Sequence, residues 1–110
     1  MELPLHIQII YSLDNLRTQI YSTVDKEVMM QTALKAIEIT ELIETKKEGK
    51  ERILNLLQNE IRSYSKSSTT EIEVIQFQLA SSILMLCLQF IEGSYDDMQA
   101  LIIELRKRAA

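Results

Sequence analysis

A chain of 110 residues can bury a core of its own, and its two glycines and single proline are too few for a β-sandwich, a β-barrel or a disordered chain. The net charge of −4 weighs against a nucleic-acid-binding protein. The single cysteine excludes an internal disulfide and a metal site built from several cysteines. Because good helix formers such as leucine, glutamate, glutamine and lysine dominate, we expect one all-α domain over residues 1–110.

The first predicted helix runs from about residue 5 to residue 21, with Pro4 in its first turn, where the missing N–H costs nothing. Apolar residues at spacings of four, three and four form its inward stripe: Ile9, Leu13, Leu16 and Ile20. Asp14 falls off this stripe. Residues 22–25 offer hydroxyl and carboxylate groups that can begin a second helix, but no glycine or proline forces a break, so the two helices could be less separate.

The second predicted helix spans about residues 26–47 and the third about residues 50–65, with Gly49 as the C-terminal cap of the second. An acidic row follows the outer side of the second helix: Glu38, Glu41 and Glu44. Such a row is typical of a solvated face, and it could also dock a basic partner. The stretch 46–52 mixes both signs of charge and lacks aromatic residues, so we expect a solvated corner between helices rather than a phosphate site.

The fourth predicted helix, about residues 71–92, is the most apolar part of the chain. It begins with a capping box, in which Thr70 and Glu73 can each bond the other's backbone N–H. The helix carries two apolar seams on opposite sides: Ile72, Ile75, Leu79, Ile83, Leu86 and Phe90 in the first, and Val74, Phe77, Leu84, Leu88 and Ile91 in the second. A helix that is apolar on two sides is either the central helix of the bundle or faces a second subunit.

A tight turn is predicted after the fourth helix. Gly93 ends that helix, and Ser94, with Asp97 three residues later, begins a fifth. Gly93 and Tyr95 resemble the turn between the two helices of a tetratricopeptide repeat. Larger residues stand where that family prefers small ones: Leu86, Met98 and Leu105. The likeness covers about residues 79–110 and implies binding of a protein or peptide in a helical groove.

The residues that could do chemistry are few. His6, the only histidine, would need a nucleophile and an orienting acid beside it to act in catalysis. Cys87 lies in an apolar run with no basic neighbour, which favours a buried structural cysteine. We therefore expect no enzyme, no cofactor, no metal and no small-molecule substrate. The run 79–91 is shorter than the about 20 residues that span a bilayer, and the first residues lack a basic n-region, so we expect a soluble, cytoplasmic protein.

The sequence thus predicts an all-α antiparallel bundle of four to five helices, with the apolar helix of residues 71–92 at its centre and a C-terminal helical hairpin. The function that fits this fold is a non-catalytic module that binds a specific protein partner, as an inhibitor, immunity protein, chaperone or adaptor does. Seven residues form the candidate partner-binding set: Glu38, Glu41, Glu44, Leu84, Leu88, Ile91 and Tyr95. A structural homodimer through the second seam is one alternative, and a nucleic-acid-binding regulator is a less favoured one.

Overall fold

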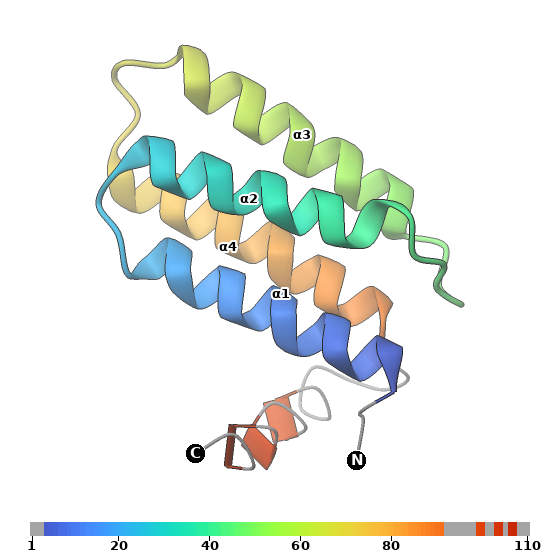
Figure 1. Ribbon diagram of the computed structural model, residues 1–110. Helices are drawn as coiled ribbons and strands as arrows, with labels where there is room; N and C mark the ends of the chain where they lie inside the picture. Colours follow the sequence, from blue (N-terminus) through green and yellow to red (C-terminus); the bar gives the residue numbers. More distant parts are fainter. Residues whose placement is uncertain (1–3, 92–98, 101–102, 105, 108–110) are drawn as a thin grey trace.

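The computed structural model describes residues 4–91, 99–100, 103–104 and 106–107 (Figure 1). In this described part the chain is all-α, as predicted, and forms four helices: α1 (Leu5–Tyr21), α2 (Lys26–Glu41), α3 (Lys50–Lys66) and α4 (Ile72–Gln89). The chain reverses direction at each connection between them (Figure 1). Both α2 and α4 pack against all three other helices, whereas α1 and α3 lie on opposite sides of this pair.

The predicted C-terminal hairpin falls largely outside the described residues. Gly93, Ser94, Tyr95 and Asp97, which carry the predicted turn, all lie there. The described residues after the gap, 99–100, 103–104 and 106–107, are helical. Hydrogen bonds from Arg106 connect this segment to α1.

α1 has the predicted bounds, and its apolar stripe is part of the core. The prediction that Asp14 lies off the buried side is wrong, because its side chain is fully buried. The first two helices are separate, because the helical structure is interrupted between Tyr21 and Lys26. Asp25 is the N-cap residue of α2, and its carboxylate accepts hydrogen bonds from the backbone N–H groups of Glu27 (2.9 Å) and Val28 (3.4 Å). The carboxylate therefore satisfies donors that the start of the helix leaves free.

α2 ends at Glu41, short of the predicted end at residue 47. Lys50, only 7 % exposed, determines this end. Its Nζ donates to the carbonyl oxygens of Ile43 at 2.8 Å and of Glu41 at 3.3 Å. These charge-assisted hydrogen bonds satisfy carbonyl groups that lack a partner inside the helix, so the chain can leave the helical path here.

Residues of the connection between α2 and α3 also bind the last carbonyl groups of α4. Lys47 donates from Nζ to the carbonyl oxygen of Leu88 at 2.8 Å, and the Thr45 hydroxyl donates to that of Gln89. Gly49 is not the C-terminal cap of α2 that the sequence predicted. It is the N-cap residue of α3, with φ −83° and ψ −10°, and its backbone N–H donates to Oε1 of Gln89 at 3.1 Å.

α4 starts one residue later than predicted, at Ile72, and its capping box is not formed. Glu71 is the N-cap residue and makes no side-chain capping hydrogen bond. The Thr70 hydroxyl bonds with that of Ser67 in the preceding loop instead. Because the N-cap is at residue 71, Glu73 is the second helical residue, one position too early for the reciprocal bond of a capping box.

α4 has more apolar residues than the core of the bundle buries. It is the one described helix that is long and apolar enough to cross a membrane, although the central helix of a soluble bundle meets the same criterion. Within the bundle, 39 % of its residues are buried. The remaining apolar side chains are therefore exposed or only partly covered.

Candidate functional site

One side of α4 is turned away from the core. We call the six residues on this side the outer stripe: Val74, Phe77, Ser81, Leu84, Met85 and Leu88. Steps of three and four residues connect them, with Leu84 and Met85 three and four residues after Ser81, and this keeps all six on one side of a helix. Phe77 is 61 % exposed, Val74 44 % and Met85 41 %, and the two leucines pack against the edge of the core. The stripe thus presents apolar surface along most of the helix.

The opposite side of α4 lies in the core. Its first predicted seam supplies four fully buried side chains: Ile75, Leu79, Ile83 and Leu86. The second predicted seam does not behave as one unit. Val74 and Phe77 are exposed, Leu84 and Leu88 are partly buried, and Ile91 is buried. Met85 is not in either predicted seam, although its position four residues after Ser81 and eight after Phe77 places it on the outer stripe.

The predicted acidic row is not a single helical row. Glu38 and Glu41 are exposed on α2, but α2 ends at Glu41, and Glu44 belongs to the following connection. Tyr95, the last residue of the predicted partner-binding set, lies outside the described residues. Of that set, Leu84 and Leu88 are the two residues that belong to the outer stripe.

A cleft of about 440 Å³ lies where α1 begins and α4 ends, lined by residues 6–7, 44–47 and 89–91. It contains His6, which is exposed at the start of α1. Two of its polar groups already have partners, because the Thr45 hydroxyl and the Lys47 ammonium donate to carbonyl oxygens of α4. The cleft therefore lies where the α2–α3 connection holds the end of α4, a long-range contact that the sequence did not predict.

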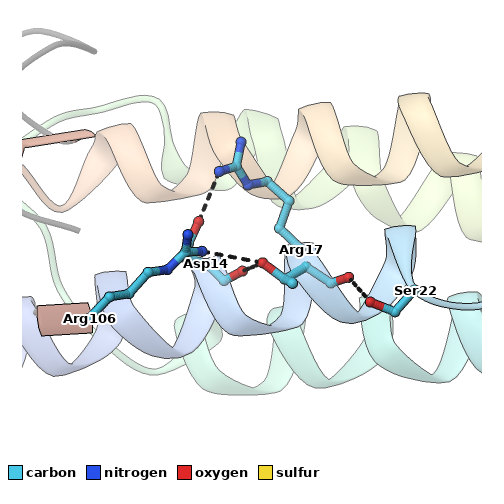
Figure 2. A network of polar contacts seen from close by, with 5 residues as sticks. Asp14, Arg17, Ser22 and Arg106 are labelled. Atoms are coloured by element: carbon cyan, nitrogen blue, oxygen red, sulfur yellow. Dashed lines mark hydrogen bonds and ion pairs between the residues drawn. The ribbon is translucent and has the colours of Figure 1, made fainter. Parts of the chain in front are cut away.

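A buried ion-pair network connects α1 to the C-terminal segment (Figure 2). The Asp14 carboxylate, with a fully buried side chain, accepts hydrogen bonds from Arg17 at 2.8 Å and from Arg106. Arg106 also donates to Oγ1 of Thr18 at 3.4 Å, and this hydroxyl donates to the carbonyl oxygen of Asp14 at 3.0 Å. Two guanidinium groups thus compensate one buried carboxylate, which would otherwise be strongly destabilising.

Cys87 is buried, as predicted, and lies close enough to this network to be affected by it. Burial, and to a smaller extent the Asp14 charge, raise the pKa of its thiol to about 12, although Arg17 opposes the rise. A thiol with this pKa is protonated at neutral pH, and a protonated thiol is a poor nucleophile and metal ligand. The Cys87 side chain is part of the hydrophobic core.

A second polar contact joins α3 to α4. The Ser82 hydroxyl donates to Oε1 of Glu60, whereas Oε2 of Glu60 is buried and has no hydrogen-bond partner. Burial raises the pKa of Glu60, and the hydrogen bond from Ser82 lowers it by less. The carboxylate therefore lies beside α4 in a partly desolvated position, next to the side of the helix that carries the outer stripe.

Among the described residues, no group of three or more histidine, cysteine, aspartate or glutamate side chains is placed to hold a metal ion. Comparisons with protein-family models, with curated proteins and with solved structures find no match. The resemblance of Gly93 and Tyr95 to a tetratricopeptide turn stays a prediction, since both lie outside the described residues.

Proposed function

We propose that this chain is a small non-catalytic module that binds a protein partner through the outer stripe of α4. The observation that carries the proposal is the exposure of Phe77, Val74 and Met85 on a helix whose other side forms the core. Full burial of one such side chain contributes about 1.5–3 kcal/mol, and in the isolated chain only part of this stabilisation is realised. Contiguous exposed apolar side chains are typical of protein interaction sites.

The charge of α4 supports the same proposal. From Val74 to Phe90 the chain carries no charged residue, although a quarter of all its residues are charged. The centre of a protein interface is depleted of charge in the same way, because a charge buried there must be paired. An inhibitor, an immunity protein, a chaperone or an adaptor would use such a surface, and the single unpaired cysteine fits a reducing cytoplasm.

The nucleic-acid alternative has less support. It would use the basic residues of the stretch 46–52 and of the C-terminal segment to bind phosphate groups. The Lys47 and Lys50 ammonium groups donate to backbone carbonyl oxygens, and Arg106 pairs with Asp14. These three cations therefore serve the fold and are not free to replace the counterions of a phosphate backbone.

Site-specific photocrosslinking in cells tests the proposed function. The photoreactive residue benzoylphenylalanine would replace Phe77, and in a matched control it would replace Val28, which is 45 % exposed on α2. We expect an intermolecular adduct from position 77 and none from position 28. Incorporation of the probe at position 77 without any intermolecular adduct would contradict a binding role for the outer stripe.

A further inference from the structure

We infer that the partner of the outer stripe is a second copy of this chain, with the two α4 helices packed antiparallel about a two-fold axis at Ser81. This inference rests on the proposed function and specifies its partner. The observations that favour a second copy are the spacing of the stripe and the distribution of charge on α4, and the area available for contact limits the strength of the dimer.

Four residues of the outer stripe are placed symmetrically about Ser81, whereas Leu84 has the polar Gln78 as its counterpart. Phe77 and Met85 lie four residues before and after it, and Val74 and Leu88 lie seven residues before and after it. In an antiparallel pair with two-fold symmetry, a residue before the axis lies opposite the residue equally far after it in the other copy. Phe77 would therefore contact the partner's Met85, a favourable sulfur–aromatic pair, and Val74 would contact the partner's Leu88.

The charges on α4 favour the antiparallel orientation. Acidic residues occur at the start of this helix, at Glu71 and Glu73, and none follows up to Ile91. A parallel pair would bring these carboxylates together, at a cost from like-charge repulsion. An antiparallel pair separates them to opposite ends and places Glu73 opposite the partner's Gln89. The charged residues of α4 itself would thus not oppose one another, and the remaining carboxylate near the contact would be that of Glu60, beside Ser82 in each copy.

The area of the stripe determines the strength of this association. An 18-residue helix is about 27 Å long and about 10 Å wide, so α4 alone offers roughly 270 Å² per chain. Stable complexes bury roughly 800 Å² per partner. Leu56, 43 % exposed on α3, lies one turn before Glu60, whose carboxylate bonds Ser82, so it extends the apolar surface beside α4. We therefore expect a weak dimer that dissociates on dilution.

Sedimentation analysis over a wide concentration range tests the dimer. We expect the wild-type mass to rise from 12.7 kDa toward twice that value as concentration increases. The double variant Phe77→Gln, Met85→Gln should weaken the dimer by about 30-fold or more, since loss of central apolar contacts commonly has this size. The control Val28→Gln should dimerise like wild type. Because all three positions are exposed, unchanged circular dichroism should confirm that each variant is folded.

A cysteine at the proposed axis tests the geometry. In Ser81→Cys the two thiols would lie opposite each other, and helices 8–10 Å apart bring facing Cα atoms within disulfide range. We expect an oxidised dimer from Ser81→Cys and none from Phe77→Cys alone, whose two copies would be about 12 Å apart along the helix axes. The native thiol should not interfere, because Cys87 is buried and its pKa is raised to about 12.

Three outcomes would overturn the inference. A constant mass of 12.7 kDa at every concentration would exclude self-association. A dimer that Phe77→Gln, Met85→Gln leaves unchanged would place the interface elsewhere. An adduct of the position-77 photocrosslinker with a different protein, or with a membrane component, would identify another occupant of the stripe. An adduct with a different protein would leave the proposed binding function intact. The absence of any intermolecular adduct, or an adduct within one chain, would contradict both the dimer and the proposed binding function.

Discussion

The guanidinium group of Arg106 donates a hydrogen bond to the carboxylate of Asp14, which lies 92 positions earlier in the chain (Figure 2). The Asp14 side chain is fully buried, whereas that of Arg106 is 52 % exposed. Arg17, one helical turn after Asp14, binds the other carboxylate oxygen. The contact therefore fastens the last described residues to the first helix, and Asp14 retains one cation if the other is removed.

Removal of these two cations should have strongly non-additive effects on stability. We expect Arg106→Gln and Arg17→Gln each to lower the free energy of unfolding by about 1 kcal/mol, because the remaining guanidinium still pairs with Asp14. The double variant leaves a buried carboxylate without a cation and should lose about 3–5 kcal/mol, more than the sum of the single losses. Urea unfolding at neutral pH measures all three values.

Arg62→Gln, at an exposed position of α3, is the control for these variants and should change stability by less than about 0.5 kcal/mol. Small and additive losses from Arg17→Gln and Arg106→Gln would show that water or a bound proton can replace the arginines at Asp14. In that event the network would not be what holds the C-terminal segment on α1.

Replacement of Glu60 by glutamine should stabilise the protein at neutral pH. Glutamine keeps an oxygen that can accept the hydrogen bond of Ser82, and its amide is uncharged where Oε2 of Glu60 is buried without a partner. We expect the free energy of unfolding of Glu60→Gln to be higher than that of wild type by about 1 kcal/mol at pH 7, because burying an uncharged amide costs less than burying a carboxylate, even where the amide N–H groups lack a partner. Urea unfolding of both proteins provides the comparison.

The same pair of proteins should differ in pH dependence. Burial raises the pKa of Glu60 above its ordinary value of 4.5, so the folded chain binds this proton more tightly than the unfolded chain does. The stabilisation that this tighter proton binding gives the folded chain is fully present below pH 4.5. It is lost as the pH rises through the raised pKa of Glu60 in the folded chain. The advantage of Glu60→Gln should therefore grow with pH over this range. Glu38→Gln, at an exposed position of α2, is the control for the loss of one negative charge. A variant less stable than wild type at pH 7 would contradict this account.

The helices themselves could be predicted from the sequence because their apolar residues recur with a helical period. The bounds of α1 agree with the prediction and those of α3 differ by one residue. The predicted ends of α2 and α4 are too late, since side chains from other elements determine them. Lys50 binds the carbonyl oxygens of Glu41, the last residue of α2, and of Ile43, and Lys47 binds that of Leu88 in α4. Local periodicity contains no information on these contacts, whose partners are seven to nine residues apart at the end of α2 and 41 residues apart at the end of α4.

The candidate site was predictable in part for the same reason. The spacing of Val74, Phe77, Leu84 and Leu88 already indicated a second apolar side of the fourth helix. Whether that side is covered depends on how the other helices pack, which only the fold shows. The burial of Asp14 could not be predicted, because the charge that compensates it comes from Arg106 at the other end of the chain.

Substitution of Gly49 tests the contact that closes the end of α4. A Cβ atom at this position would lie 2.6 Å from Oε1 of Gln89, the atom that accepts the hydrogen bond of the Gly49 N–H. The backbone angles of Gly49 are ordinary for any residue, so the effect of Gly49→Ala comes from this side chain and not from strain. We expect Gly49→Ala to cost about 1 kcal/mol, because the displaced Gln89 leaves the N–H without its acceptor.

A double-mutant cycle separates this contact from other effects of the new methyl group. In a Gln89→Ala background the obstructing amide and its hydrogen bond are already gone, so Gly49→Ala should change the free energy of unfolding by less than about 0.5 kcal/mol. Urea unfolding of the four proteins gives the coupling energy directly. An equal loss in both backgrounds would mean that alanine at position 49 disturbs the start of α3 itself, and that the hydrogen bond to Gln89 contributes little to holding the α2–α3 connection against α4.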